Sequence, residues 1–451
     1  MSLRENNMPR PDPFWVKLLP AKIRVRLEGR HNLFAVLHNS GWLVADRVFK
    51  AIAAIVVSAW VARYLGPEEY GKLAYILAIV AVFQVVCILG LDGIVVRDIA
   101  KNKDESGLLL GTTFMMRLVA GLVCWTGLVL SMAIVFGWGN ENMWLSLFIG
   151  GSLIFQAGDT IDLWFQSQVQ SRRTVLAKFI AVLISSSLRV LFIVFKAPLL
   201  YFAVAFFAET AIVAVALAIS YQLFKCGQKW QFRLKERGKI LLKESWPFIV
   251  SGLSVYIYMR VDQVMIRNIL GEKELGIFSA VIVLSTGWYF LPVTLCSSLL
   301  PSLSKLRTDN KELYLKRTAK VFRLLLLLSI GISLFIYWQG ENLIALIFGE
   351  KYIAGHAALG IHVFTNISVF LGVGQSAWIL NEKKQKLFLL QTLAGGATSV
   401  LLNLMLIPKY GIAGASISAA VSMFISAVLI NFIFAKKLFY LQLGIYKKNT
   451  V

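Results

Sequence analysis

The sequence is poor in charged residues, and in acidic residues above all. Charged side chains make up 16% of its 451 residues, and 24 Asp and Glu stand against 46 Lys and Arg. Soluble domains usually carry about 25% charged residues. Apolar residues reach 58% and recur in stretches of about 17 to 25 residues, the length that crosses a bilayer as a helix. The composition predicts an all-α, polytopic integral membrane protein.

Cysteine, histidine and catalytic motifs are scarce as well. The sequence lacks a GxxxxGK[ST] phosphate loop, a nucleophile elbow and an HExxH helix. Its few cysteines are widely spaced, so they form neither a disulfide framework nor a zinc motif: Cys87, Cys124, Cys226 and Cys296. We therefore expect no cofactor, no metal ion and no enzymatic activity. The polar, proline-interrupted N-terminus is unlike a signal peptide, so targeting is expected to come from the first membrane helix.

The apolar segments predict about twelve membrane helices, six in each half of the chain. Their expected spans are 41–61, 71–95, 108–136, 143–165, 175–195, 199–224, 247–269, 275–299, 322–348, 357–380, 387–407 and 412–434. The corresponding organisation is a basic N-terminal segment at 1–38, an N-lobe at 39–224, a basic interfacial linker at 225–245, a C-lobe at 246–435 and a basic tail at 436–451. We expect the two lobes to surround a central cavity, walled mainly by the first seven helices.

Lysine and arginine are concentrated in alternate loops and in both terminal segments. Because positive residues are retained in the cytoplasm, both termini are expected to be cytoplasmic. The opposite loops contain only Lys72, Lys196, Lys273, Lys351 and Lys409. This distribution explains the net charge of +22 without a nucleic-acid partner, which would require a basic surface on a soluble module. The linker is interpreted as a tether on anionic lipid headgroups, with a role in substrate capture as the alternative.

A heptapeptide at the end of the seventh expected helix has a close copy at the end of the first. The two stretches are LGEKELG at 270–276 and LGPEEYG at 65–71. The chain therefore consists of two related halves, and glycine at these positions predicts matching turns between helices. Arg260 and Asp262 precede the second copy but have no counterparts before the first, where Ile55 and Val57 stand.

Ionisable residues inside apolar helices are costly in lipid and are therefore candidate functional residues. The cations are Arg47, Lys50, Arg117, Lys178, Arg189 and Arg260, and the anions are Asp46, Asp159, Asp162, Glu209 and Asp262. The near balance of charge permits a structural network of ion pairs. The alternative is that unpaired arginines face an anionic headgroup, because guanidinium stays charged and grips phosphate oxygens with two hydrogen bonds.

Five motifs follow one another along the chain: ARYLGPEEYG at 62–71, GLDGIVVRD at 90–98, RVDQ at 260–263, FGEKY at 348–352 and IPKYGIAGA at 407–415. In this order they resemble the motifs of the Wzx-type polysaccharide and O-antigen exporters of the multidrug/oligosaccharidyl-lipid/polysaccharide superfamily. The resemblance covers roughly residues 34–435. It implies alternating access and translocation of an undecaprenyl-pyrophosphate-linked glycan across the bacterial inner membrane. It also implies a polysaccharide polymerase and a chain-length regulator as partners.

We predict a flippase in which Arg47, Arg117, Arg189 and Arg260 bind the substrate. Candidate ion-coupling residues are Asp159, Asp162, Glu209 and Asp262, although a carboxylate paired with arginine would not titrate near neutral pH. An organic-cation antiporter of the same superfamily is the nearest alternative, but it should have an acidic cavity. A glycan polymerase or ligase would need a long outer loop, and a sugar porter would need an Asp-Arg-x-Gly-Arg motif in the second loop. Neither is present in the sequence.

Overall fold

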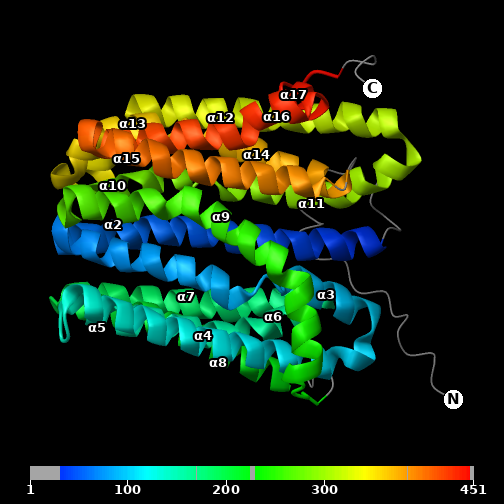
Figure 1. Cartoon of the computed structure of the whole chain (residues 1–451), viewed down its shortest axis with the longest axis horizontal. Helices are drawn as coiled ribbons and strands as arrows, with labels where there is room; N and C mark the ends of the chain where they lie inside the picture. The colour runs from blue at the N-terminus through cyan, green and yellow to red at the C-terminus, as the bar shows by residue number, and fades with distance from the viewer. Residues whose placement is uncertain (1–30, 169, 224–228, 383, 447–451) are drawn as a thin grey trace.

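The structure is a computed structural model of the chain, and it describes residues 31–168, 170–223, 229–382 and 384–446. The side chains of residues 31–48, 50–52, 54, 171, 172, 235, 258, 301 and 377 also lie outside the description. The described residues form helices joined by short turns. Figure 1 shows most of these helices running side by side in two groups, which we call the N-lobe and the C-lobe.

The N-lobe comprises the helices of the first half. They are α2 (His31–Ile88), α3 (Asp92–Lys101), η2 (Lys103–Glu105), α4 (Ser106–Phe136), α5 (Glu141–Phe155), η3 (Gln156–Asp159), α6 (Thr160–Ser167), α7 (Ser171–Val194) and α8 (Leu199–Leu223). Helix α2 consists of two segments joined at Gly66, which has a non-helical conformation with φ 76° and ψ 170°. The elements α5, η3 and α6 follow one another directly.

The linker contains η4 (Leu234–Gly238), and the C-lobe comprises the helices that come after η4. They are α9 (Lys239–Leu270), α10 (Glu272–Thr286), α11 (Phe290–Asp309), α12 (Lys311–Ile347), η5 (Glu350–Gly355), α13 (His356–His362), α14 (Thr365–Asn381), α15 (Gln385–Phe424), η6 (Ile425–Leu429), α16 (Ile430–Phe434) and α17 (Lys436–Gln442). Helix α15 consists of two segments joined at Gly411, with φ 59° and ψ −142°.

The expected number of membrane crossings agrees with this architecture. Within the described ranges, eight helical stretches are long and apolar enough to span a membrane, and the bent pair α13 and α14 makes up to nine. Helices α2 and α15 each contain two segments that run in opposite directions across the molecule (Figure 1). The run α5–η3–α6 supplies the remaining crossing, so twelve crossings are divided equally between the lobes.

One end of the molecule carries α3, η4 and α17, and we call it the inner end, after the orientation that the sequence predicts. The turns at the opposite, outer end are built on residues with positive φ, which glycine adopts without steric cost. The outer turns contain Gly66, Gly137, Lys196, Gly271, Gly349 and Gly411. Both copies of the repeated heptapeptide thus form the glycine turns that the sequence predicts.

The two copies of the heptapeptide meet at the outer end, across the boundary between the lobes. A Cβ atom added to Gly71 would lie 1.8 Å from the backbone oxygen of Glu272, and one added to Gly276 would lie 1.7 Å from that of Pro67. The approach is therefore reciprocal, and each glycine admits the backbone of the other copy.

Polar contacts reinforce the same boundary between the lobes. The Tyr352 hydroxyl donates a 2.6 Å hydrogen bond to the carbonyl oxygen of Ala62. The Arg63 guanidinium donates to the carbonyl oxygens of Ala345 and Leu346, which lie in the last turn of α12. The outer ends of the lobes are therefore fastened together.

The buried apolar residues form one cluster that both lobes share and separate clusters within each lobe. One cluster is shared by the lobes and includes Ala62 and Ile76 of α2 together with Phe278 and Ile282 of α10. Toward the inner end, the N-lobe and the C-lobe each have a separate cluster, formed around residues such as Leu163 and Leu303 respectively. The lobes thus share one core at the outer end and have separate cores at the inner end.

The described part of the linker packs on the N-lobe at the inner end. The amide of Gln231 donates a 3.1 Å hydrogen bond to the carbonyl oxygen of Gly107, and Arg97 forms a 2.7 Å ion pair with Glu244. Figure 1 shows η4 and the first part of α9 crossing the direction of the other helices. Helix α9 already begins at Lys239, inside the segment expected to be a linker, because its apolar residues continue before Pro247.

Candidate substrate site

Two of the predicted charges form an ion pair between α7 and α8. The Arg189 Nη2 atom lies 2.6 Å from Oε2 of Glu209, and the Ser185 hydroxyl donates a 2.8 Å hydrogen bond to the same carboxylate oxygen. The guanidinium also lies over the ring of Phe206, 4.2 Å from its centroid. Its Nε atom is buried and has no hydrogen-bond partner among the described residues. Arg189 therefore retains one unused donor.

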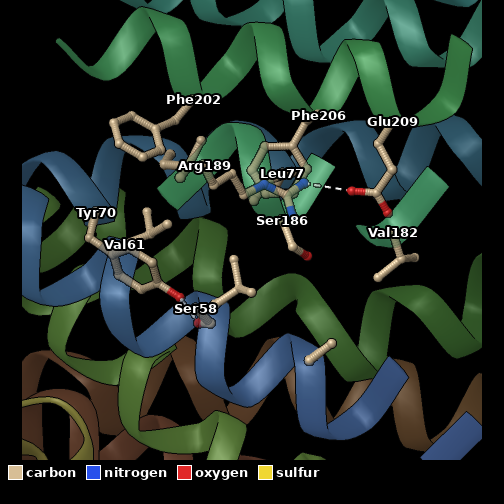
Figure 2. A pocket seen from close by; sticks show the side chains of 13 residues that line it. Ser58, Val61, Tyr70, Leu77, Val182, Ser186, Arg189, Phe202, Phe206 and Glu209 are labelled. Atoms are coloured by element: carbon tan, nitrogen blue, oxygen red, sulfur yellow. Dashed lines mark hydrogen bonds and ion pairs between the residues drawn. The ribbon is translucent and has the colours of Figure 1, made fainter. Parts of the chain in front are cut away.

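This ion pair lies in the wall of a cavity of about 390 Å³ within the N-lobe. Figure 2 shows Arg189 and Glu209 pointing toward each other beside Phe206. Most of the lining is apolar and comes from both segments of α2, from α7 and from α8. The lining residues are Ala53, Val57, Ser58, Val61, Tyr70, Leu73, Leu77, Val182, Ser186, Arg189, Phe202, Phe206 and Glu209.

A pair of hydroxyl groups adds to the polar surface of the cavity. The oxygen atoms of Ser58 and Tyr70 lie 2.7 Å apart and join the two segments of α2 by a hydrogen bond. Ser186 lines the cavity from α7. The cavity thus combines one neutralised ion pair and three hydroxyl groups with an apolar wall.

Arg260 approaches this region from the C-lobe. It is exposed on α9 and makes no ion pair with the side chains that the structure describes. Helix α9 packs against α2, whose residue Tyr70 lines the cavity together with Arg189. Two predicted substrate-binding residues, Arg189 and Arg260, thus lie on helices of different lobes that each pack against α2.

Asp262 lies two residues further along α9, about half a turn, and its surroundings differ from those of Arg260. Its side chain is buried, with 5% of the residue exposed, and Oδ1 accepts a 2.7 Å hydrogen bond from the amide of Gln263. Among the described residues it makes no ion pair, so it stands apart from the other three candidate ion-coupling carboxylates.

The two other candidate ion-coupling carboxylates of the N-lobe, Asp159 and Asp162, share one lysine. The Lys178 Nζ atom lies 2.6 Å from Asp162 Oδ2 and 3.5 Å from Asp159 Oδ1. The 3₁₀ segment η3 ends at Asp159, and α6 follows directly and carries Asp162. Both carboxylates are therefore neutralised by α7 and lie outside the cavity lining.

Arg117 lies elsewhere in the N-lobe. Only 2% of it is exposed, and it pairs with Asp92 while donating a 3.3 Å hydrogen bond to the carbonyl oxygen of Ile88. Those two residues flank the break between α2 and α3, where Leu89 and Gly90 have positive φ. Arg117 therefore joins two helix ends and does not line the cavity. The Arg47 side chain lies outside the described residues.

Sequence reasoning did not find Ser58, Tyr70, Ser186 or Asp92. Ser58 and Ser186 belong to a residue type that is common in membrane helices, and their spacing gives no signal. Tyr70 and Asp92 stand within the motifs at 62–71 and 90–98, which marked them as parts of a pattern but not as a cavity residue and a partner of Arg117. In the described part of the chain no group of three or more His, Cys, Asp and Glu side chains is arranged to hold a metal ion. The site offers binding groups for a charged or hydroxylated ligand.

Comparisons with known proteins identify the family of this chain. Residues 36–307 match the family described as Polysaccharide biosynthesis protein. Over 184 residues the chain is 28% identical to the capsular polysaccharide biosynthesis protein CapF of Staphylococcus aureus. That match covers 40% of this chain and 45% of the relative, so it spans less than half of the length of CapF.

Two solved structures show how far the fold is shared. An inward-facing multidrug resistance MATE family transporter of the MOP superfamily has a TM-score of 0.68 and 15% identity, covering 88% of this chain and 99% of that one. The lipid II flippase MurJ, in an inward closed conformation, has a TM-score of 0.67 and 15% identity, covering 89% and 90%. At this identity the likeness concerns the fold.

Proposed function

Because the chain belongs to the polysaccharide biosynthesis protein family, whose fold is that of MOP-superfamily transporters rather than enzymes, we propose that it is a lipid-linked oligosaccharide flippase. Its substrate is an undecaprenyl-pyrophosphate-linked repeat unit, which moves from the inner to the outer leaflet of the bacterial cytoplasmic membrane. The repeat unit is destined for O-antigen or another surface polysaccharide.

The observation that carries this proposal is the position of Arg260. An exposed guanidinium without an ion pair among the described residues is costly in an apolar helix unless an anion or water meets it. A pyrophosphate supplies that anion, and the guanidinium group of arginine binds phosphate oxygens with bidentate hydrogen bonds. The neighbouring cavity, with Arg189 and its hydroxyl groups, then receives part of the glycan.

The division of the core supports alternating access. Lobes that share a buried cluster at the outer end and have separate clusters at the inner end can admit a substrate from the inner side. Translocation then requires the outer contacts to open, including the approach of Gly71 to Glu272. The polyprenyl tail stays in lipid throughout, so only the polar headgroup needs a path through the protein.

The orientation, the partners and the coupling belong to the same proposal. Both termini are cytoplasmic, and a polysaccharide polymerase and chain-length regulator act with the flippase, which co-purification would test.

If an ion gradient drives transport, Asp262 is the strongest of the coupling candidates, because Asp159, Asp162 and Glu209 are each paired with a cation. Transport that continues unchanged after the proton and sodium gradients are collapsed would exclude coupling.

The experiment exchanges each of Arg47, Arg117, Arg189 and Arg260 for glutamine in a strain that lacks the native protein. We expect surface polysaccharide to be lost while the protein still reaches the membrane, as measured by immunoblotting of membrane fractions. Unaltered export in all four variants would overturn the proposal.

A multidrug antiporter is the second candidate, favoured by the fold similarity to a multidrug transporter. The described cavity has no excess of acidic residues, which an organic cation would require. Drug susceptibility that is unchanged in the deletion strain, together with lost polysaccharide, distinguishes the flippase from this alternative.

A further inference from the structure

We infer that the inner end of the C-lobe holds an anionic phospholipid between α12 and α17, and that Lys320 and Lys436 bind the phosphate of its headgroup. The ligand is a lipid of the surrounding membrane, so its binding is independent of the transported substrate. The proposed function assigns no role to this surface.

One face of α12 changes from basic to apolar along the helix. Lys316, Lys320 and Arg323 are exposed, and their spacing of four and three residues places them on one face. Leu327 and Leu334 continue this face and are 62% and 54% exposed. Basic side chains are thus followed directly by apolar side chains that face lipid. A phospholipid has the same order, with a charged headgroup at the membrane surface and apolar chains below it.

Helix α17 packs against α12 beside this change from basic to apolar residues (Figure 1). The Arg323 guanidinium donates a 2.9 Å hydrogen bond to the carbonyl oxygen of Gly444, which follows α17. The Lys316 Nζ atom lies 5.8 Å from the ring centroid of Tyr446. Leu438 of α17 is buried in one apolar cluster with residues of α12. The two helices therefore form one continuous surface at the inner end.

Buried amide groups fix the position of α17. The Nε2 atom of Gln442 donates a 3.1 Å hydrogen bond to Oε1 of Gln375 on α14 and a 2.8 Å hydrogen bond to the carbonyl oxygen of Ala427 in η6. Gln442 and Gln375 are 1% and 4% exposed. Because buried amides are costly unless they are hydrogen-bonded, undocking α17 would leave these groups unpaired. The surface between α12 and α17 is therefore preformed.

The outward face of α17 combines a cation with apolar side chains. Lys436 is exposed at the first position of the helix, and Leu443, seven residues further on, is 45% exposed. The ring of Phe439 lies 5.2 Å from that of Phe432 on α16, and Phe432 is itself 51% exposed. Apolar surface thus extends from α16 onto α17. Amphipathic helices of this kind lie in the interface of membranes that contain anionic lipids.

The charges of this surface favour an anionic headgroup. Segment 430–446 contains no acidic residue, and Glu312, the acidic residue within 311–323, pairs with Lys316 at 2.7 Å. Lys320 and Lys436 are exposed and make no ion pair with the side chains that the structure describes. A zwitterionic headgroup would bring an ammonium group close to these lysines, whereas phosphatidylglycerol brings negative charge alone.

The test measures the lipids that delipidated, purified full-length protein binds in native mass spectrometry. The probes are phosphatidylglycerol, phosphatidylethanolamine with the same acyl chains, and undecaprenyl pyrophosphate. We expect wild-type protein to bind phosphatidylglycerol about fivefold or more tightly than phosphatidylethanolamine. The double variant Lys320→Gln/Lys436→Gln should weaken phosphatidylglycerol binding by about tenfold or more, because one basic residue beside an anionic lipid contributes about fivefold.

The matched control is the double variant Lys101→Gln/Lys103→Gln. Both lysines are exposed at the inner end of the N-lobe, so this variant loses the same charge from the same end and leaves α12 and α17 unchanged. It should weaken phosphatidylglycerol binding by less than about twofold, because exposed charges more than about 10 Å away are largely screened at an ionic strength of about 0.1 M.

Three results would overturn the assignment. Equal losses of phosphatidylglycerol binding in the two double variants would show that the inner surface attracts anionic lipid without a defined site. Equal binding of both phospholipids by wild-type protein would contradict the selection by charge. If undecaprenyl pyrophosphate binds more tightly than phosphatidylglycerol and loses this affinity in Lys320→Gln/Lys436→Gln, the occupant is the carrier lipid and not a phospholipid.

Discussion

At the scale of single residues, most described charges within the membrane helices have a partner on a different helix. Arg189 pairs with Glu209, Lys178 with Asp162 and Asp159, and Arg117 with Asp92. A buried ion pair contributes little net stability, but removing one partner leaves an uncompensated charge and is strongly destabilising. These pairs therefore fix how the helices of the N-lobe pack.

The sequence predicted which residues would be charged in the membrane but not how they pair. Spacing along one helix identifies neighbours at three and four residues, and no acidic residue stands there for Arg117 or Arg189. Their partners lie on other helices and become visible only when the helices are packed. Arg117 pairs with Asp92, as the expected network of ion pairs permits, and its role in binding substrate stays a prediction.

We predict that Arg117→Gln lowers the free energy of unfolding by about 1.5–3 kcal/mol, the range for a hydrogen bond to a charged group. The physical reason is the loss of the contacts to Asp92 and to the Ile88 carbonyl oxygen, which hold the α2–α3 break. Thermal unfolding in detergent measures the change in stability of the variant. Arg317→Gln, at an exposed position on α12, is the control and should change stability by less than about 0.5 kcal/mol. Equal unfolding temperatures for the two variants would contradict the assignment.

At the scale of the helices, the repeated heptapeptide uses its glycines in two ways. Gly66 and Gly271 have positive φ and open space around them, so they serve the turn. Gly71 and Gly276 are helical and admit the backbone of the other copy. Sequence comparison of the halves predicted the turns, because a glycine before a helix start is a local signal. The contact between the copies depends on how the lobes dock and left no local signal.

We predict that Gly71→Ala weakens closure of the outer end by about 1–3 kcal/mol, the range for overpacking a tight contact. The added methyl group would collide with the Glu272 carbonyl group, so the two helices must move apart. Spin labels at Glu68→Cys and Lys273→Cys, both exposed, would report a longer distance across the outer end.

Gly127→Ala is the matched control for this variant. Gly127 lies in α4, and a Cβ atom there meets no other atom within 4 Å. In Gly127→Ala, the distance distribution between the spin labels at positions 68 and 273 should match that of wild-type protein. If Gly71→Ala also leaves the distribution unchanged, the close approach does not control the outer end.

At the scale of the whole molecule, composition and the pattern of apolar segments predicted the twelve-crossing fold, and the structure and the family agree. The sequence did not predict the breaks at Leu89–Gly90 and between α13 and α14, because the apolar character continues through them. It did not predict the cavity within the N-lobe either. Cavities arise where packed side chains leave space, and the order of residues along one helix does not show this.

The central claim is that this protein moves a lipid-linked glycan between leaflets and that Arg260 holds its pyrophosphate. The most direct measurement is transport in reconstituted vesicles, with a fluorescent undecaprenyl-pyrophosphate-linked oligosaccharide and an impermeant quencher. Wild-type protein and Arg317→Gln should expose the lipid of the inner leaflet much faster than protein-free vesicles do. Arg260→Gln should slow this exposure by about tenfold or more, equivalent to about 1.4 kcal/mol. Wild-type vesicles no faster than protein-free ones, or an Arg260→Gln rate equal to wild type, would contradict the account.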